Sequence, residues 1–285
     1  MIDSKIIIDK NKCDLCGNCI KICGSKTLEI IDDSIVQTYP TLCCSCGHCA
    51  AICPENAITA SEENHRAFTI RNFDENLTEI EKLLIGKRSV REFKSKEIDK
   101  NILEKFIHYA EKSPSSSNSR KREYFVITDK NKILALEKAV LNKFNALKII
   151  VNPLIINVLK VFNKKLSRNF SLVWEDIKQM NKDFAKGDFP VFRNAPTIIC
   201  IIAPKGAVQA KDDCIIAQQY MMLYAQSQGI GSCIIGYAQY AHNALEKVLK
   251  VKKGYSIYAV SIFGYPKFAY TKEIQYLKKI EINWI

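Results

Sequence analysis

Residues 13–30 read CDLCGNCIKICGSKTLEI, and residues 43–60 read CCSCGHCAAICPENAITA, which is the same unit shifted by 30 positions. Cysteines coincide at four aligned positions, and the run Cys-Gly-x-Cys matches in full. Two such copies predict a small pseudo-symmetric domain, because each copy alone buries too little apolar surface to fold without a cross-link. Nine of the 12 cysteines fall between Cys13 and Cys53, so we expect this domain to bind metal.

The cysteine spacing C-x2-C-x2-C-x3-C occurs twice, and Pro54 follows the second run. With this spacing the segment resembles the bacterial ferredoxins that carry two [4Fe-4S] clusters, in which the fourth cysteine of each run binds the other cluster. The resemblance implies that one cluster takes Cys13, Cys16, Cys19 and Cys53, and that the other takes Cys43, Cys46, Cys49 and Cys23.

Two structural zinc sites are the alternative interpretation of these cysteines. Zinc sites favour pairs of C-x2-C separated by a longer loop, and four cysteines within eleven residues fit that pattern poorly. The sequence departs from the ferredoxin pattern twice: Gly24 replaces a proline, and Cys44 is an extra cysteine beside Cys43. Cys44 could replace Cys43 as a ligand, but a small buried hydrophobic residue is the preferred interpretation.

The charge of the chain is divided between two parts. The formal net charge is +12, but residues 1–70 hold six Lys/Arg and nine Asp/Glu, so the remainder carries +15. A basic chain suggests nucleic acid or an anionic membrane as partner. Because each oxidised cluster with four thiolates adds about −2, the excess positive charge shrinks and we expect no nucleic-acid partner.

The rest of the composition is that of an ordinary soluble globular protein, with 47% hydrophobic and 25% charged residues among 285. No run approaches the roughly 18 apolar residues of a membrane span, and the first residues do not resemble a signal peptide. Because most of the cysteines fit a metal-binding role, and disulfides are rare in the cytoplasm, we expect a cytoplasmic protein without a membrane span.

Hydrophobic periodicity predicts an α+β domain at residues 71–285, after the cysteine-rich domain at residues 1–70. Residues 61–76 are typical of a polar linker, and a capping box at Thr78 and Glu81 begins a helix that ends near Gly86. Further helices are predicted at 97–112, throughout 130–188, at 212–228 and from a capping box at Asn243 and Glu246. Strands are predicted at 124–128, 195–204, 233–236 and 255–263.

The most apolar stretch, LKIIVNPLIINVLKVF at 147–162, permits two interpretations. It is either an interfacial membrane helix or an insertion, kinked at Pro153, that packs over an active site or a dimer interface. We prefer the insertion, because a half-polar lid helix has the same pattern. The nearby aromatic residues Trp174, Phe184, Phe189 and Phe192 are candidate walls of a substrate pocket.

Five short motifs follow each other in the basic part of the chain. They are KRSVREF at 87–93, SPSSSNS at 113–119, RNAP at 193–196, GIGSC at 229–233 and GYP at 264–266. Three cations and a serine within five residues suit a phosphate group. In this order the motifs resemble those of the FMN-dependent nitroreductase family over residues 77–285. The whole chain is similar to the form of that family that is fused to an N-terminal ferredoxin with two clusters.

The resemblance implies a role for each matching residue. The residues that hold the FMN phosphate and ribityl chain would be Lys87, Arg88, Ser89 and Arg91. Those that reach the flavin from the partner subunit of a homodimer would be Pro114, Ser115, Ser116 and Asn118. Those beside the flavin ring would be Ile234, Ile235 and Gly236, and Lys272 stands where relatives often have a phosphate-binding arginine. Residues 119–121 depart from the family, since Ser-Arg-Lys replaces the usual Gln-Pro.

The expected activity is that of an oxidoreductase. Electrons would pass from two [4Fe-4S] clusters to FMN and on to a small organic acceptor such as a nitroaromatic, a quinone or an activated alkene. An external donor such as ferredoxin would supply them, because no nicotinamide-binding motif is visible: the Gly229-x-Gly231 pair follows a helix and lacks the third glycine. The alternative is a redox sensor or electron carrier without substrate turnover.

Overall fold

The computed structural model describes residues 6–60, 68–74, 76–270, 272–277 and 280–285. The chain forms two compact units: unit 1 comprises Met1–Lys87 and Lys267–Ile285, and unit 2 comprises Arg88–Pro266. These units differ from the predicted division at residue 70. Residues near both ends of the chain share unit 1 because β5 (Phe68–Asn72) pairs antiparallel with β10 (Lys272–Tyr276).

Unit 1 shows the sequence repeat as a structural repeat. The helices α1 (Asn18–Ile22) and α2 (His48–Ile52) stand 30 residues apart, and each follows a glycine in the left-handed region, with φ of 69° at Gly17 and 72° at Gly47. Two antiparallel strand pairs complete this part: β1 (Ile6–Ile8) with β4 (Ile58–Ala60), and β2 (Leu28–Ile31) with β3 (Ser34–Gln37). A 3-10 turn, η1 (Pro40–Leu42), leads into the second cysteine run.

The β5–β10 pair corrects the prediction that residues 61–76 are a linker, of which 61–67 and 75 lie outside the described residues. Phe68 of β5 and Ile274 of β10 are both buried in the hydrophobic core of unit 1, together with Leu28 and Ile58. Glu273 forms an ion pair with Arg71 directly opposite, at 2.6 Å between Oε2 and Nε. The next helix, α3 (Glu79–Gly86), begins with the predicted capping box of Thr78 and Glu81.

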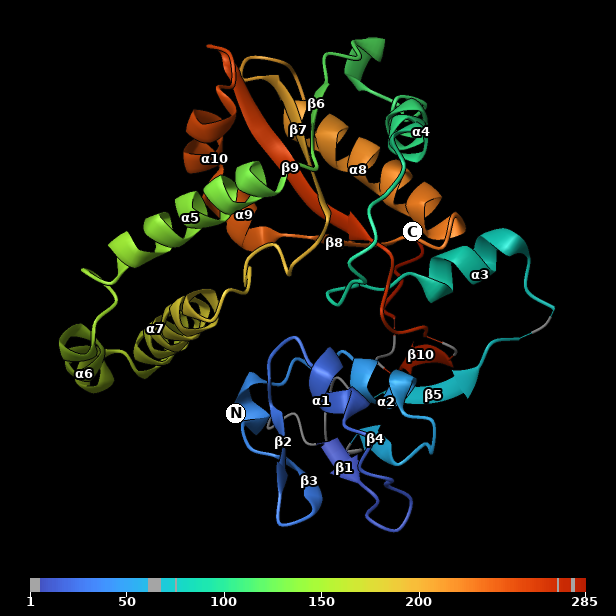
Figure 1. Cartoon of the computed structure of the whole chain (residues 1–285), viewed down its shortest axis with the longest axis vertical. Helices are drawn as coiled ribbons and strands as arrows, with labels where there is room; N and C mark the ends of the chain where they lie inside the picture. The colour runs from blue at the N-terminus through green and yellow to red at the C-terminus, as the bar shows by residue number, and fades with distance from the viewer. Residues whose placement is uncertain (1–5, 61–67, 75, 271, 278–279) are drawn as a thin grey trace. The chain divides into compact units, whose positions relative to one another are not determined.

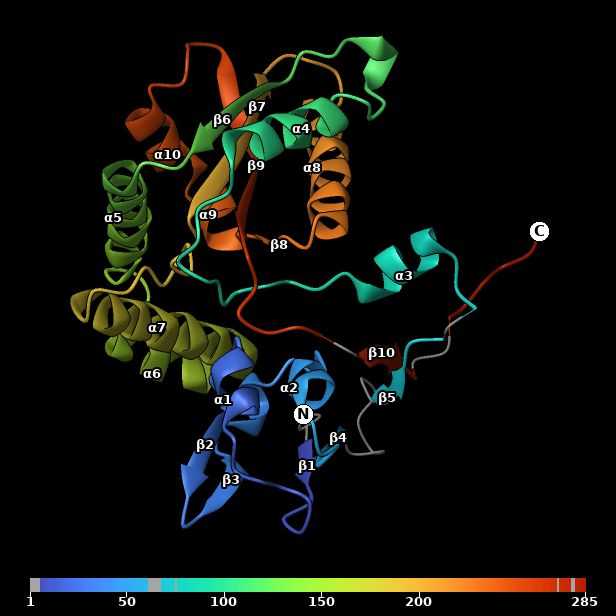
Figure 2. The ribbon, with the colours of Figure 1, turned by 45° about the vertical axis from the view of Figure 1, so that its right-hand side comes forward.

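Unit 2 is built on a four-stranded antiparallel sheet in the order β6-β7-β9-β8, which confirms the α+β class. The strands are β6 (Glu123–Ile127), β7 (Thr197–Pro204), β9 (Tyr255–Gly264) and β8 (Gly231–Ile234). Alternate residues of β7, among them Ile199 and Ile201, pack under α4 (Lys100–Ala110) and α8 (Ala210–Ser227). The other face is covered by α5 (Lys130–Leu147), α9 (Gly236–Tyr240) and α10 (His242–Leu249), as Figures 1 and 2 show.

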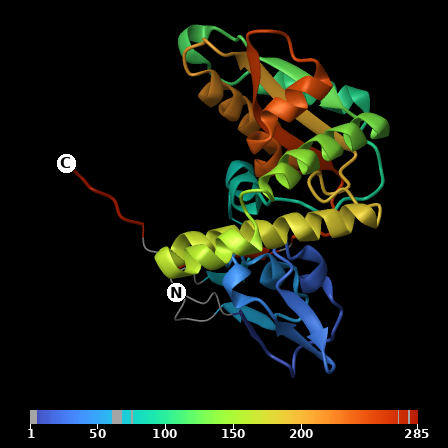
Figure 3. The same ribbon diagram turned by 90° about the vertical axis from the view of Figure 1, so that its left-hand side faces the viewer.

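The remaining helices confirm that residues 130–188 are mostly helical. After α5 come α6 (Pro153–Phe162) and α7 (Lys164–Ala185), which is yellow in Figure 3. The predicted kink at Pro153 is wrong: this proline begins α6, and Asn152 caps the helix by accepting a hydrogen bond from the Ile155 amide at 3.1 Å. In the described part of the chain, no helix has the length and apolar character needed to cross a membrane.

The predicted capping box at Asn243 is also wrong. The helix α10 begins at His242, and the residue before it, Ala241, makes no side-chain cap. The carboxylate of Glu246 instead accepts hydrogen bonds from the Ser256 hydroxyl and the Ile257 amide of β9. The glutamate therefore ties α10 to the sheet instead of capping the helix.

Candidate functional sites

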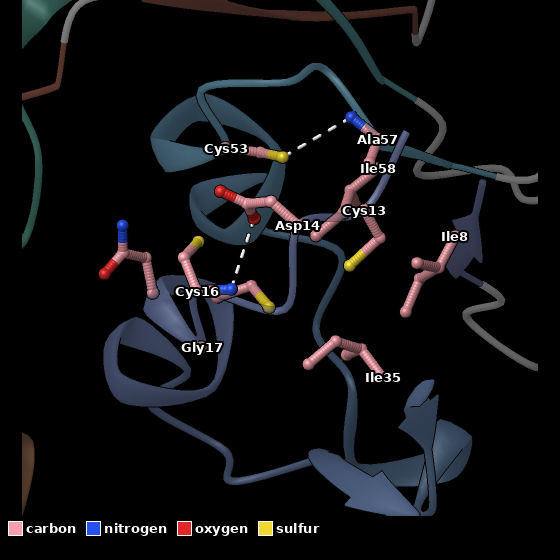
Figure 4. A pocket seen from close by; sticks show the side chains of 11 residues that line it. Ile8, Cys13, Asp14, Cys16, Gly17, Ile35, Cys53, Ala57 and Ile58 are labelled. Atoms are coloured by element: carbon pink, nitrogen blue, oxygen red, sulfur yellow. Dashed lines mark hydrogen bonds between the residues drawn. The ribbon is translucent and has the colours of Figure 1, made fainter. Parts of the chain in front are cut away.

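Four thiols of unit 1 line one pocket between the two copies of the repeat. Cys13, Cys16 and Cys19 come from the first cysteine run, and Cys53 comes from the end of the second. Figure 4 shows Cys13, Cys16 and Cys53 around this pocket, with Ile8, Ile35 and Ile58 as its apolar wall. The repeat thus brings the last cysteine of one run to the first three of the other.

Burial and coupling between neighbouring sulfurs raise the pKa of several thiols. The prediction that Cys44 is buried is wrong: its side chain is exposed, and its hydrogen bond with Cys46 raises the pKa of Cys46. Burial raises the pKa of Cys19 to about 11, and the thiols of Cys13, Cys16 and Cys53 add to this effect. Burial also raises the pKa of Cys49 to about 12, and the thiols of Cys23, Cys43 and Cys19 add to this effect. Thiols that oppose each other's ionisation in this way require a compensating positive charge to become ligands.

Backbone amides donate to three of these sulfurs. Thr27 donates to Cys23 and Ala57 donates to Cys53, both at 3.4 Å, and the two bonds are again 30 residues apart. Ser45 donates to Cys43 at the same distance. Hydrogen bonds to sulfur are a feature that tunes iron–sulfur sites, so these residues suit a cluster.

In the described residues, no three His, Cys, Asp or Glu side chains are gathered in a geometry that holds a metal ion. A four-iron cubane requires a different ligand geometry from a single metal ion. Each thiolate binds a different iron, so the four sulfurs lie around a pocket and do not converge on one point. The pocket that Cys13, Cys16, Cys19 and Cys53 line has this form.

The C-terminal part of unit 1 packs against the second cysteine run. Ile274 lies so close to Gly47 that a β-carbon on this glycine would stand 2.8 Å from its side chain. Tyr276 donates a hydrogen bond to the Cys46 carbonyl at 3.5 Å. Lys272 donates to the Cys53 carbonyl and to Asn56 Oδ1, both at 2.6 Å. These contacts do not support the assignment of Lys272 to an FMN phosphate.

In unit 2, the loop after Lys87 runs along the β8 edge of the sheet. Ser89 forms a parallel bridge with Ser232 of β8, and the Val90 amide donates to the Ser232 carbonyl at 3.0 Å. The approach is close, because a β-carbon at Gly231 would stand 2.7 Å from the Val90 side chain. Glycine is therefore required in the GIGSC motif, since it allows β8 to contact the basic loop.

This contact places two guanidinium groups in the same region. Burial lowers the pKa of Arg193, and the positive charge of Arg91 lowers it further. The Ser232 hydroxyl is buried and has no hydrogen-bond partner among the described residues. Two cations that repel each other fit an anionic ligand such as a phosphate, and so does an unsatisfied hydroxyl elsewhere on β8.

A buried carboxylate holds the turn that carries Arg193. Glu137 of α5 is fully buried and accepts hydrogen bonds from the amides of Val191 and Phe192, at 2.8 and 3.1 Å. Burial raises its pKa to about 7, although the two amides partly offset this. Phe192 itself is completely buried, so it is not a wall of an open substrate pocket.

The serine-rich loop is fixed from inside by a second buried network. The guanidinium of Arg122 donates to Ser113 Oγ at 2.7 Å and to the Asp213 carbonyl at 3.1 Å, and it pairs with Glu111 at 3.3 Å. The Asp213 side chain accepts from the Ser116 amide at 2.9 Å. In this loop Ser117 and Asn118 have φ of 51° and 48°, which is unfavourable backbone for residues other than glycine.

The third predicted segment lies where β8 ends and α9 begins. Ile235 is buried and its amide donates to the Val260 carbonyl of β9 at 3.1 Å, whereas Ile234 is 37% exposed. A β-carbon on Gly236 would meet open space. A flat ligand could therefore approach this backbone from the side of Ile234 and Gly236.

Within unit 2, the structure thus brings Arg91 near Arg193 and Ser89 to β8, and it anchors Pro114 and Ser116 through Arg122 and Asp213. Lys87 ends α3 and belongs to unit 1. Sequence reasoning singled out the RNAP motif but gave Arg193 no role, and it missed Arg122, Glu137 and Asp213. Burial of the charged group distinguishes Arg122, Glu137 and Asp213, and it is visible only in the fold.

Comparisons with known proteins divide the chain in a similar way. The model of the nitroreductase family matches residues 84–265, and that of the 4Fe-4S dicluster domain matches residues 5–61. No curated protein is a significant match.

Solved structures with the same fold include a nitroreductase with bound FMN from Desulfitobacterium hafniense DCB-2. It is 20% identical, with a TM-score of 0.54, over 73% of this chain and 100% of the other. An FMN-dependent nitroreductase from Clostridium difficile R20291 is 25% identical, with a TM-score of 0.47, over 71% of this chain and 98% of the other.

Proposed function

Because this chain belongs to the nitroreductase family and carries a match to a 4Fe-4S dicluster domain, we propose that it is an FMN-dependent oxidoreductase that draws electrons from two [4Fe-4S] clusters. Its substrate would be a small organic acceptor of the nitroaromatic, quinone or activated-alkene type. When bound, FMN supplies hydride transfer and the clusters supply single electrons.

One observation carries the proposal: within the family-matching unit, the guanidinium of Arg91 lies near enough to the buried guanidinium of Arg193 for its charge to lower the pKa of Arg193. In this proposal the two guanidinium groups, with Arg88 and Ser89, hold the FMN phosphate. The open side of Ile234 and Gly236 accommodates the flavin ring, and Ile235 keeps that backbone attached to β9.

The serine-rich loop has a separate task. We assign Pro114, Ser115, Ser116 and Asn118 to the flavin of a second copy of the chain in a homodimer. The buried contacts of Arg122 and Asp213 hold this loop in its left-handed conformation, so its polar atoms would be positioned before the ligand binds.

In unit 1, Cys13, Cys16, Cys19 and Cys53 would bind one cluster, and Cys23, Cys43, Cys46 and Cys49 would bind the other. The support comes from the pocket that the first four cysteines share, the mutual effect of neighbouring thiols on their pKa values and the amides that donate to sulfur. Lys272 would contribute its charge here, next to the Cys53 carbonyl, and not at the flavin.

The test is an anaerobic preparation analysed for iron, sulfide and FMN, followed by reduction and mixing with an acceptor. We expect about eight irons and one FMN per chain, a dimer by light scattering, and reoxidation of the reduced flavin by a nitroaromatic or a quinone. Protein that binds zinc in place of iron would contradict the cluster assignment. Bound FMN that no acceptor reoxidises would favour an electron carrier or sensor.

A further inference from the structure

The segment around α6 has an apolar face that remains open to solvent. Six large side chains of this segment are exposed: Ile149 (78%), Ile150 (57%), Leu154 (79%), Val158 (58%), Val161 (78%) and Phe162 (82%). Leu154, Val158, Val161 and Phe162 follow a helical repeat, so they share one side of α6. Ile156, on another side, is buried, and its carbonyl accepts a hydrogen bond from Ser167 of α7 at 2.9 Å. We call the six exposed residues the α6 face.

Every charged residue in the sequence around the α6 face is a cation. Between Glu137 and Glu175 there is no acidic residue. The seven cations in this interval are Lys138, Lys143, Lys148, Lys160, Lys164, Lys165 and Arg168. Lys160, Lys164 and Lys165 are exposed at the end of α6 and the start of α7, directly beside the apolar residues. Apolar side chains and cations are therefore presented together.

The position of α6 makes this surface accessible. Within unit 2, α6 packs on α7 and lies at the end of α5 that is remote from the four-stranded sheet, as Figures 1 and 2 show. The core of unit 2 lies between the sheet and the helices that cover it, so the α6 face is not needed to complete that core. Single exposed apolar residues are normal, but six on one short segment indicate an interaction surface.

Of the two interpretations of residues 147–162, the exposure of these six side chains favours the interfacial helix over the preferred insertion. We propose that the α6 face binds an anionic lipid surface as a peripheral helix. Leu154, Val158, Val161 and Phe162 would enter the boundary between headgroups and acyl chains, while the lysines contact lipid phosphates. This proposal is independent of the FMN and cluster assignments.

Two other partners fit the α6 face less well. Nucleic acid would meet aliphatic side chains, and Phe162 is the single aromatic residue among the six, so base stacking is not provided for. A second copy that packed α6 against α6 about a two-fold axis would bring Lys160, Lys164 and Lys165 of each copy toward those of the other. An anionic membrane satisfies both the charge and the apolar surface.

The test is sedimentation of the intact, FMN- and iron-loaded protein with vesicles of phosphatidylcholine, either alone or mixed with phosphatidylserine. We expect binding to the mixed vesicles to be at least about tenfold tighter and to weaken as salt is added. Leu154→Asp with Phe162→Asp should weaken binding about tenfold or more, because the apolar insertion is lost. Reversal of Lys160, Lys164 and Lys165 to Glu should weaken it about a hundredfold or more.

Two matched variants serve as controls. Val208→Asp changes an apolar residue that is 74% exposed in the turn before α8, and Lys250→Glu reverses an exposed cation after α10; both should bind as the wild type does. Equal binding to both kinds of vesicle, or none, would overturn the proposal. It would also fail if Leu154→Asp with Phe162→Asp split a dimer without changing vesicle binding, because a second copy would then cover the α6 face.

Discussion

The proximity of Arg91 and Arg193 destabilises the folded protein, because burial and mutual repulsion both disfavour the charge on Arg193. A dianionic phosphate would remove this repulsion and gain charge-assisted hydrogen bonds worth about 1.5–3 kcal/mol each. Sites in which the free protein is electrostatically frustrated are commonly sites of ligand binding.

We therefore expect Arg88→Ala or Arg91→Ala to weaken FMN binding by roughly ten- to a hundredfold, since about 1.4 kcal/mol is a factor of ten. Excess FMN should restore activity, and the cluster absorbance should be unchanged. Equilibrium dialysis measures the effect, with Lys100→Ala on exposed α4 surface as the control. Wild-type flavin occupancy in both arginine variants would refute the phosphate assignment.

Arg122 should influence FMN affinity without contacting the flavin. A lysine at this position has one ammonium group, which cannot reach Ser113, Asp213 and Glu111 together. In Arg122→Lys the serine-rich loop should lose its fixed conformation, and FMN affinity should fall about tenfold. Lys121→Ala, an exposed neighbour, is the control. Unchanged affinity in Arg122→Lys would show that the buried network is only structural.

Glu137 gives unit 2 a pH-dependent stability. Its pKa is raised to about 7 in the folded protein from an ordinary 4.5, so between these values the folded chain keeps a proton that the unfolded chain has lost. Stability therefore falls as the pH rises through this window, by about 1.4 kcal/mol per unit. Relative to the Glu137→Gln variant, the free energy of unfolding of the wild type should fall by about 2 kcal/mol between pH 5.5 and 8.

Urea unfolding followed by flavin fluorescence tests this difference. The Gln variant shares every other titrating group, including the FMN phosphate, so subtraction isolates the carboxyl. A wild type and a variant that respond to pH in parallel would show that Glu137 ionises normally in the folded state.

Residue-level predictability followed the strength of the local pattern. The eight cysteines and the basic loop were visible as motifs, because their chemistry requires fixed spacing. Arg122, Glu137 and Asp213 carry no such spacing: their partners are brought to them by strands and helices from 9 to 97 positions away. A charged residue in a sequence is ordinarily exposed, and only the fold shows that these are buried.

At the scale of elements, β10 stabilises the fold of unit 1. Ile274 contributes to the core and packs on Gly47, which precedes α2. Truncation of a buried isoleucine to alanine costs about 2–5 kcal/mol. Ile274→Ala should therefore destabilise unit 1 and accelerate iron loss on dilution or mild heating, whereas FMN content should stay constant.

Ile280→Ala is a matched control, since Ile280 lies in the same terminal segment and is 80% exposed. Iron release can be followed by loss of visible absorbance in the presence of a chelator. If both variants release iron at the wild-type rate, β10 does not stabilise the cluster-binding fold.

Sequence reasoning predicted the long elements of unit 2 and missed both β5 and β10. The central strand β7 is apolar at every buried position after Thr197, so its pattern alone is decisive. In contrast, Phe68–Asn72 and Lys272–Tyr276 contain few apolar residues, and each is a strand only because the other lies opposite it. Pairing between segments about 200 residues apart leaves no local signal.

The same limit explains two smaller errors. Pro153 was expected to kink a helix, yet proline is equally favourable at the first helical position, where the missing amide costs nothing. Asn243 and Glu246 have the spacing of a capping box, but the Glu246 carboxylate accepts hydrogen bonds from Ser256 and Ile257 of β9 instead. In both cases the local pattern permitted two structures, and the tertiary contacts selected one.

At the scale of the whole molecule, the division into two units predicts that the cofactors can be removed separately. Cys16→Ser and Cys49→Ser would each disrupt one cluster, so each should lose about half of the iron and retain FMN. Electrons from the reduced donor should then reach the flavin slowly or not at all. Cys44→Ser is the internal control and should keep all the iron. Loss of iron in Cys44→Ser would show that Cys44, and not Cys43, is the ligand.

The pairing of β5 with β10 also has a consequence for biosynthesis. Domains usually fold in the order in which the ribosome produces them, with the N-terminal one first. Here the first unit lacks one of its strands until residue 276 has been synthesised, and the whole of unit 2 is made in between. The cysteines at the start of the chain are therefore translated first and enclosed last. These cysteines would therefore stay accessible to iron while the rest of the chain is translated.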